Sequence, residues 1–266
     1  IGSLAIHGTV NDLAVAGAIP RYLSLNAFIE EGMSFEQLER IVKSMAEAAR
    51  EANVAIVTGD TKVVPRGEGA GVFFATSGIG TKENNLTLGM DQIQTGDKIL
   101  VSGTVGDHGT AVMLAREQFG LKGDLKSDAA SVLPYTTALL DLNGLRFMRD
   151  PTRGGLASVC NEISRATQQE VHLNQSEIPL HEQVESVCEI LGYDPLYLAC
   201  EGRVVAIVSE HQADEALRRW YTIENGQDAR IIGEIREGEP HVVLETELGG
   251  ERFLEELEDD PLPRIC

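Results

Sequence analysis

The sequence predicts an α+β fold in two domains. Predicted strands and helices alternate irregularly along the 266 residues, and several of the strands are half-polar. Both features favour layered α+β architecture over a parallel doubly wound sheet. A polar, turn-like stretch at 91–97, "DQIQTGD", separates two groups of elements, so we place a domain boundary near residues 85–92.

The first group of elements begins with a predicted helix over residues 1–17. Its apolar positions fall on one helical face: Ile6, Val10, Leu13, Ala14 and Gly17. Strict alternation predicts a strand at 22–29, and two further strands are predicted at 54–60 and 71–80. Between them a second helix is predicted after Ser34, which forms a capping-box pattern with Gln37.

The second group repeats this mixed pattern. Strands are predicted at 98–103, 203–209, 229–235 and 241–247, and helices at 109–119, 128–141, 155–167, 181–191 and 211–220. The chain then ends in an acidic segment followed by "PLPRIC". Two prolines within three residues prevent a helix, so we expect an extended arm that carries Cys266.

Charge and composition exclude several classes of protein. The formal net charge of −20 disfavours binding to nucleic acid or to an anionic membrane, so any anionic ligand must be held locally. No apolar stretch approaches the roughly 20 residues that span a bilayer, and no signal peptide is recognisable. We therefore expect a cytoplasmic protein. The chain starts without methionine close to a helix, and we expect that an N-terminal part is missing.

The cysteines also indicate a reducing compartment. Cys160 and Cys188 lie in apolar helical patterns and are expected to be buried small side chains. None of the four cysteines forms a C-x-x-C pair or shows zinc-ligand spacing. Cys266, on the last residue, does not fit a core role.

Three aspartates follow strands or interrupt apolar segments near glycines. They are Asp12 beside Asn11, Asp60 in "TGDTK", and Asp107 in "SGTVGDHG". Hard cations take carboxylate oxygens, and Mg²⁺ typically links them to substrate phosphates. The alternative is ordinary turn chemistry, since Asp and Gly are common in turns.

The stretch "MRDPTRGGLA" predicts an anion site at a helix N-terminus. Gly154 and Gly155 open a helix whose first N–H groups are free, and Arg149 and Arg153 add positive charge. The alternative is a helix start with a chance arginine pair. No phosphate-binding motif of the G-x-x-x-x-G-K-[ST] type is present, and "GEGAG" at 67–71 is not a dinucleotide motif.

Six segments together resemble one known family. They are "HGTVNDLAVAGAIP", "GDTKVV", "SGTVGDHG", "MRDPTRGGLA", "LACEGR" and the terminal "PRIC". The chain resembles, along its whole length, the HypE carbamoyl dehydratases of [NiFe]-hydrogenase maturation. These belong to a superfamily with aminoimidazole ribonucleotide synthetase and selenophosphate synthetase.

The resemblance implies an architecture. It implies a homodimeric, two-domain α+β fold, with an ATP-binding and dimerisation domain at 1–88, an α+β domain at 89–255 and a flexible tail at 256–266. The family pattern also has an N-terminal glycine-rich segment with a Thr-Asp-Ser strand, which this sequence lacks. Part of the family's ATP site is therefore expected to be missing here.

The resemblance also implies a reaction. In this family HypF places a carbamoyl group on the terminal cysteine, and the protein uses ATP to dehydrate it to a thiocyanate. The cyano group then passes to iron held by the HypC–HypD complex. Arg264 beside Cys266 is expected to help dock the tail or favour the thiolate.

Candidate residues follow from the resemblance and the motifs together. For Mg-ATP we name Asp12, Asp60 and Asp107 as metal ligands, with Asn11, Thr61 and His108 beside them. Around the phosphates we place Asp150, Arg153 and Gly154. Lys62 and Glu201, with Cys266 as the substrate thiol, are the catalytic candidates.

Each catalytic candidate has an alternative role. Lys62 is either a proton-transfer group or a phosphate clamp. Glu201 is either a partly desolvated base or the ion-pair partner of Arg203, and His108 is either a ligand contact or a structural histidine. Two rival functions stay open, namely another ATP-using member of the superfamily and a non-enzymatic thiol carrier.

Overall fold

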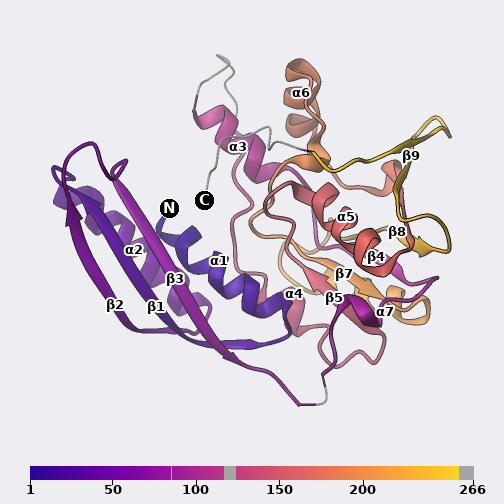
Figure 1. Cartoon of the computed structure of the whole chain (residues 1–266), viewed down its shortest axis with the longest axis horizontal. Coiled ribbons are helices and arrows are strands. Elements are labelled where there is room, and N and C mark those ends of the chain that lie inside the picture. Colours follow the sequence, from indigo (N-terminus) through magenta and orange to yellow (C-terminus); the bar gives the residue numbers. More distant parts are fainter. Residues whose placement is uncertain (85, 117–123, 258–266) are drawn as a thin grey trace.

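The chain folds into two parts that lie side by side, each with its own sheet (Figure 1). The structure, a computed structural model, describes residues 1–84, 86–116 and 124–257. Strands and helices are mixed in both parts, so the α+β prediction is confirmed. Within the described residues, no helix is both long and apolar enough to cross a lipid bilayer.

The N-terminal part is a three-stranded sheet covered on one face by two helices. The order of its elements is α1 (Gly2–Val15), β1 (Ile19–Glu30), α2 (Phe35–Glu51), β2 (Ala55–Val64) and β3 (Val72–Thr81). The strand order is β2-β1-β3, with β1 parallel to β2 and antiparallel to β3. Ile6 and Val10 of α1 pack with Leu23 of β1 and Met45 of α2 in the core of this part.

Local sequence signals account for the two helices. The predicted face of α1 is confirmed, because Ile6, Val10 and Ala14 are all buried. The predicted capping box of α2 is also confirmed. Ser34 Oγ accepts a hydrogen bond from the backbone N–H of Gln37, and the Gln37 side chain accepts one from the Ser34 backbone.

The C-terminal part is built on a seven-stranded sheet with the order β10-β9-β6-β8-β4-β7-β5. Its strands are β4 (Lys98–Val101), β5 (Leu145–Arg149), β6 (Glu170–Asn174), β7 (Val205–Val208), β8 (Arg230–Arg236), β9 (Val242–Glu245) and β10 (Glu251–Phe253). Its helices are α3 (Asp107–Ala115), α4 (Leu133–Thr137), α5 (Gly155–Thr167), α6 (Glu182–Leu191) and α7 (Glu210–Tyr221). Three short 3-10 turns lie at Met90–Gln92, Gln175–Glu177 and Pro195–Tyr197.

Helices cover both faces of this larger sheet. Leu156 and Ile163 of α5 pack on one face, in a core that includes Ile99 and Ile207. Trp220 of α7 packs on the other face in a second core, together with the α4 region. Helix α1 contacts β3 of its own sheet and also α4 and β5, and so lies at the junction between the two parts.

Several predicted elements are confirmed and others are wrong. The helix predicted at 155–167 is observed as α5, and α6 and α7 match their predictions within one residue at each end. The helix predicted at 128–141 is reduced to α4, because residues 128–132 run across to the loop at Glu201. The strands β5, β6 and β10 were not predicted.

The position of Asp60 also differs from the prediction. The sequence places it in a turn after a strand ending near residue 60, whereas β2 continues to Val64. Residues Ala55 to Val63 of β2 are all exposed in the single chain. A strand with both faces exposed carries no alternating hydrophobic pattern, so its polar second half looks like a turn in the sequence.

Candidate functional site

Asp107 anchors a buried polar network at the start of α3. Gly106 caps the helix in the left-handed region, with φ of 79°, and directs the Asp107 side chain inwards. The Asp107 carboxylate accepts hydrogen bonds from Thr104 Oγ1 at 2.5 Å and from Arg203 Nη2 at 3.3 Å, and His181 Nδ1 lies 2.8 Å away. Protein groups thus occupy the carboxylate that was predicted to bind a metal.

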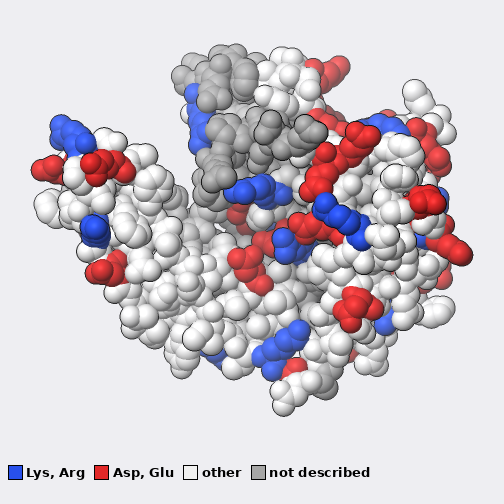
Figure 2. All heavy atoms as spheres, in the orientation of Figure 1, with Lys and Arg blue, Asp and Glu red and all other residues white. Residues whose placement is uncertain are grey.

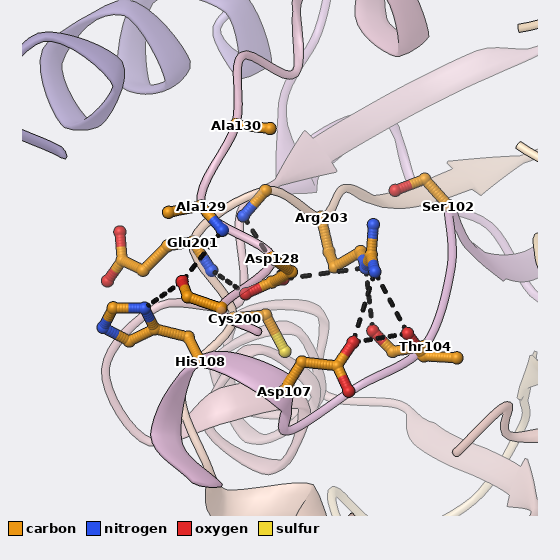
Figure 3. Close-up of polar contacts among 12 residues, drawn as sticks. Ser102, Thr104, Asp107, His108, Asp128, Ala129, Ala130, Cys200, Glu201 and Arg203 are labelled. Carbon is orange, nitrogen blue, oxygen red and sulfur yellow. Dashed lines mark hydrogen bonds and ion pairs between the residues drawn. The ribbon is translucent and has the colours of Figure 1, made fainter. Parts of the chain in front are cut away.

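Arg203 lies between two buried carboxylates in this network (Figure 3). Besides Asp107, its guanidinium lies 3.6 Å from the Asp128 carboxylate. Its Nε also donates to the Thr104 carbonyl at 2.8 Å. The arginine therefore joins the loop before α3 to the segment at 128.

Asp128 is a site residue that the sequence did not reveal. Its side chain is 1% exposed, and it accepts hydrogen bonds from the backbone N–H groups of Glu201 at 3.1 Å and Gly202 at 3.4 Å. Burial raises the pKa of this carboxyl group, and the nearby Arg203 charge opposes that rise. Because residue 128 was expected in a helix, no pattern in the sequence pointed to this contact.

Glu201 lies beside this network on the loop before β7. The residue is 5% exposed, and its carboxylate points away from Arg203, towards the side where the His108 ring lies (Figure 3). Arg203 forms ion pairs with Asp107 and Asp128. A buried carboxylate in a fixed position is a candidate general base.

Asn11 connects helix α1 to the same loop. Its Nδ2 donates to the carbonyls of Ala130 at 3.0 Å and Glu201 at 3.3 Å, and its Oδ1 accepts from Val132 N–H at 3.0 Å. Asn11 was predicted to contact the nucleotide. In the structure it is a buried bridge between the two parts of the chain.

His108 keeps one ring nitrogen unpaired in the interior. The residue is 4% exposed, and its Nδ1 lies 2.7 Å from Ser127 Oγ. Its Nε2 is buried and has no hydrogen-bond partner among the residues that the structure describes. Burial lowers the pKa of this imidazole, so it is held neutral. A buried polar atom without a partner is unusual and suggests a ligand contact.

A second group of charges surrounds Asp150, directly after β5. Asp150 is 6% exposed, and burial together with the negative charge of Asp12 raises its pKa to about 6. Burial also raises the pKa of Asp12, opposed by the charge of Arg149. Arg149 in turn lies 3.6 Å from Glu162. Asp12 and Asp150 are therefore close enough to influence each other.

The predicted anion site at the start of α5 has suitable backbone geometry. Gly154 has φ of 70° and caps α5 without a side-chain hydrogen bond. The Gly155 N–H donates to the Thr152 carbonyl at 3.0 Å and the Ser158 N–H to the Gly154 carbonyl at 3.1 Å, which leaves the N–H groups of Leu156 and Ala157 for an anion. A Cβ at Gly154 would lie 2.0 Å from Ser158 Oγ, so only glycine fits. The exposed Arg153 precedes it. Figure 2 shows positively charged side chains near the centre of the view, at the junction of the two parts.

Asp60, Thr61 and Lys62 lie apart from these groups, on strand β2. The Asp60 carboxylate accepts a hydrogen bond from the Thr61 N–H at 2.8 Å. In the register of the sheet Asp60 is opposite Asn26 and Lys62 is opposite Phe28, so both side chains share the face that the helices leave open.

The predicted metal ligands Asp12, Asp60 and Asp107 are not brought together in the single chain. In the described ranges 1–84, 86–116 and 124–257, no group of three or more His, Cys, Asp or Glu side chains could hold a metal ion. Asp107 is engaged by Arg203, and Asp60 lies on an exposed strand. Of the three, Asp12 lies near another predicted carboxylate, that of Asp150.

The thiol prediction for Cys266 lies outside the described residues. The described chain before it is well fixed: the Leu254 carbonyl accepts from Asn161 Nδ2 at 2.9 Å, and the Glu255 carbonyl accepts from the Tyr197 hydroxyl at 2.6 Å. Glu256 forms an ion pair with Arg165. Cys160 and Cys188 are buried, as predicted, and so is Cys200.

Comparison with known proteins identifies both parts of the fold. Residues 1–81 match the family model of the AIR synthase related protein, N-terminal domain, and residues 94–245 match that of the AIR synthase related protein, C-terminal domain. Carbamoyl dehydratase HypE of Bradyrhizobium diazoefficiens is 45% identical over 269 residues, covering 100% of this chain and 78% of the relative.

Solved structures agree with this match. A crystal structure of E. coli HypE superposes with a TM-score of 0.96 at 45% identity, over 100% of this chain and 82% of that chain. HypE in complex with ATP gives 0.93 at 43% identity, over 98% and 80%. HypE in a HypE–HypF complex gives 0.93 at 42% identity, over 96% and 84%. The chain therefore has the two-domain α+β fold of the AIR synthase related proteins and belongs to the HypE family of carbamoyl dehydratases.

Proposed function

We propose that this protein dehydrates an S-carbamoyl group on its own Cys266 to a thiocyanate in an ATP-dependent, hydro-lyase type reaction. The observation that carries the proposal is the buried Glu201, whose carboxylate points towards the side where His108 lies. The buried Nε2 of His108 has no hydrogen-bond partner within the described part of the chain. Its relatives named carbamoyl dehydratase and the ATP-bound HypE support the choice of substrate and nucleotide.

The reaction removes one oxygen and two protons from the thiocarbamate. The overall change is S–C(=O)–NH₂ plus ATP to S–C≡N plus ADP and inorganic phosphate. ATP, when bound, supplies the phosphoryl group that makes the carbonyl oxygen a leaving group. The chain must then accept protons from nitrogen. Glu201 is the proposed acceptor, because its carboxylate is buried on the side of the His108 ring and a positioned carboxylate can act as a general base.

His108 and Lys62 are assigned supporting roles. His108 is held neutral by burial and is fixed at Nδ1 by Ser127, so that Nε2 is free to contact the nucleotide or the substrate. Lys62 provides a cation either as a phosphate clamp or as a proton-transfer group. Its position on the open face of the sheet, with Asp60 and Thr61 in the same strand, fits a contact with the nucleotide.

The donor set around Asp150 fits a nucleotide with Mg²⁺. Magnesium usually takes one or two protein carboxylates and completes its shell with phosphate oxygens and water. The coupled pair Asp12 and Asp150 would supply the carboxylates. The turn at Gly154 with the N–H groups of Leu156 and Ala157, and Arg153 beside it, would hold the phosphates. Asp107 is assigned to positioning α3 instead of to the metal.

Each of the three parts of the chain has a different proposed role. Residues 1–88 form the nucleotide-binding and dimerisation domain, residues 89–255 carry Glu201 and Asp150, and residues 256–266 form the tail. Glu256 is the last residue with a described anchor, and the ten residues 257–266 that follow it end in Cys266. An extended segment of that length reaches roughly 35 Å, enough for a tethered thiol to visit a site and a partner.

The proposed assembly is a homodimer that pairs through the open sheet face. Phe28 and Phe73 are opposite each other on this face and are 39% and 53% exposed, and Tyr22 and Ile79 form a similar pair at 53% and 70%. An apolar patch of this kind is typical of an interface. A two-fold symmetric dimer would cover it on both copies and would bring Lys62 and Asp60 to the interface.

The tail is proposed to interact with two partner proteins. A HypF-type carbamoyltransferase would load Cys266, as the HypE–HypF complex of a relative suggests. A HypC–HypD complex would accept the cyano group on iron, in the cytoplasm.

ATP turnover tests the proposal. The full chain is carbamoylated by HypF, and phosphate release is measured with Mg²⁺ and ATP. We expect one phosphate per carbamoyl group, and none from the Cys266→Ala variant or from uncarbamoylated protein. Transfer of the carbamoyl group to a partner without phosphate release would instead establish a thiol carrier. Phosphate release that needs selenide or a purine precursor would indicate another member of the superfamily.

A further inference from the structure

The backbone of Glu201 is held at its N–H and at its carbonyl by two residues that are far away in the sequence. On one side, Asp128 accepts its N–H at 3.1 Å. On the other, Asn11 donates to its carbonyl at 3.3 Å. The two bonds come from different parts of the fold, since Asn11 belongs to α1 and Asp128 precedes α4.

The Asp128 side of this contact is rigid. The carboxylate also accepts the Gly202 N–H at 3.4 Å and lies 3.6 Å from Arg203 Nε. Gly202 allows this close approach, because a Cβ there would lie 2.0 Å from the Asp128 carbonyl oxygen. The Asp128 carboxylate is thus engaged by hydrogen bonds and an ion pair with residues 201–203, and its side chain is 1% exposed to solvent.

The Asn11 side is equally constrained. The same amide that binds the Glu201 carbonyl donates to the Ala130 carbonyl at 3.0 Å and accepts from Val132 N–H at 3.0 Å. A weaker backbone contact, Ala130 N–H to the Glu201 carbonyl at 3.5 Å, runs beside it. Asn11 is 2% exposed, so these bonds do not compete with water.

We propose that Asp128 and Asn11 are positioning residues that fix the Glu201 backbone and thereby aim its carboxylate at the reacting group. The inference rests on the proposed role of Glu201 in the dehydration. It assigns a function to Asp128, which no sequence motif marks, and it changes the role of Asn11 from a nucleotide ligand to a residue that joins α1 to the site. A displacement of about 1 Å in a catalytic group can cost up to about 100-fold in rate.

The chain offers matched controls for both residues. Asn161 also donates its amide to two backbone carbonyls, those of Ala157 and Leu254, each at 2.9 Å. Asp97 is a buried aspartate that accepts a backbone N–H from Gln94 at 2.8 Å and lies 3.4 Å from Arg146. Neither control contacts Glu201 through a described bond, so each loses similar interactions away from the site.

The experiment measures dehydration in the carbamoylated full chain. The variants are Asn11→Ala and Asp128→Asn, with Asn161→Ala and Asp97→Asn as controls. For each, the rate constant at saturating ATP and the ATP concentration for half-maximal rate are determined, and circular dichroism checks folding. We expect a fall of about 10- to 100-fold in the rate constant for the two site variants. Their half-maximal ATP concentration and the rates of both controls should stay within about 3-fold of the parent.

A double variant separates positioning from general loss of structure. Glu201→Asp already displaces the carboxylate by one methylene, so adding Asp128→Asn to it should have a much smaller effect than Asp128→Asn alone. The proposal would be overturned if the fold-losses of Glu201→Asp and Asp128→Asn simply multiplied in the double variant. It would also be overturned if Asn11→Ala and Asp128→Asn folded and kept the rate constant of the parent. A raised ATP requirement for Asn11→Ala with an unchanged rate constant would restore its role as a nucleotide ligand. Parent activity in Glu201→Gln would instead refute the catalytic role of Glu201, on which the inference rests, whereas absence of dehydration in the parent itself would refute the proposed function.

Discussion

The Asp107 carboxylate lies 3.3 Å from Nη2 of Arg203, although the two residues are 96 positions apart in the sequence. Their side chains are 3% and 15% exposed, so solvent screens this pair weakly. Because Arg203 also contacts Asp128, the pair joins the start of α3, the segment at 128 and the loop of Glu201 into one unit. The geometry of the candidate site therefore depends on this ion pair.

Replacing Asp107 should destabilise this unit. In Asp107→Asn, Arg203 and Thr104 lose a charged acceptor in the interior, and we expect the free energy of unfolding to fall by about 2–3 kcal/mol. Urea unfolding, followed by the fluorescence of the single tryptophan, Trp220, measures this. The exposed Asp214→Asn variant is the control and should change by less than about 0.5 kcal/mol. Equal unfolding midpoints for the two variants would contradict the assignment.

The glycine at the start of α5 should tolerate no side chain. Gly154→Ala meets both a left-handed backbone and a contact with Ser158, whereas Gly192, with φ of 73°, has open space around its Cβ position. We expect Gly192→Ala to cost about 1 kcal/mol, and Gly154→Ala clearly more, with weaker ATP binding. Thermal unfolding and calorimetric ATP titration of both variants test this. An equal loss of stability at the two positions would show that the Ser158 contact is unimportant.

The raised pKa of Asp150 predicts a pH-dependent stability. An aspartate in the unfolded chain ionises near 3.8, whereas Asp150 in the fold ionises at about 6. Between these values the folded state binds more protons, so this group lowers stability as pH rises through the window, and the loss is complete above it. Without nucleotide or Mg²⁺, Asp150→Asn should therefore gain up to about 3 kcal/mol at pH 7.5 and nothing below about pH 4.

Unfolding of Asp150→Asn and the parent across pH 4 to 8 tests that expectation. The exposed Asp214→Asn variant in α7 is the control and should show no such difference. A gain in stability that is the same at every pH would mean that ionisation of Asp150 is not its source. Loss of Mg-ATP binding in Asp150→Asn would agree with its proposed role beside Asp12.

The open face of the three-stranded sheet should mediate dimerisation. Phe28→Glu places a charge opposite Phe73 in the middle of this face and should convert the protein to a monomer in sedimentation velocity. Ile190→Glu, at a 67% exposed position on α6, is the control and should leave the dimer intact. A monomeric parent, or a dimer that survives Phe28→Glu, would place any interface elsewhere.

The sequence predicts elements well where a local signal exists. The capping box of Ser34 and Gln37 and the buried face of α1 depend on residues within one or two turns, and both are confirmed. The 155–167 helix is observed as well. The strand predicted at 54–60 was too short, because the second half of β2 is polar and exposed and so shows no alternating hydrophobic pattern.

The buried network could not be predicted in the same way. Asp128 owes its role to contacts with Glu201 and Arg203, more than seventy positions away. Such a contact leaves no local pattern in the sequence. The motif "LACEGR" therefore pointed to Glu201 but not to Asp128, which binds its backbone. The motif around Asp107 drew attention to this carboxylate, but its contacts with Arg203 and His181, 96 and 74 positions away, left no local pattern in the sequence.

The most direct test of the central claim is the intact mass of the full chain before and after ATP. Protein carbamoylated by HypF is incubated with Mg²⁺ and ATP, with parallel samples that lack ATP and with Cys266→Ala. The account predicts that the carbamoylated species loses the mass of one water, only with ATP and only when Cys266 is present. A carbamoyl group that forms on Cys266 and never loses water in the presence of ATP would contradict it, and would leave a carrier without the proposed roles of Glu201 and Lys62.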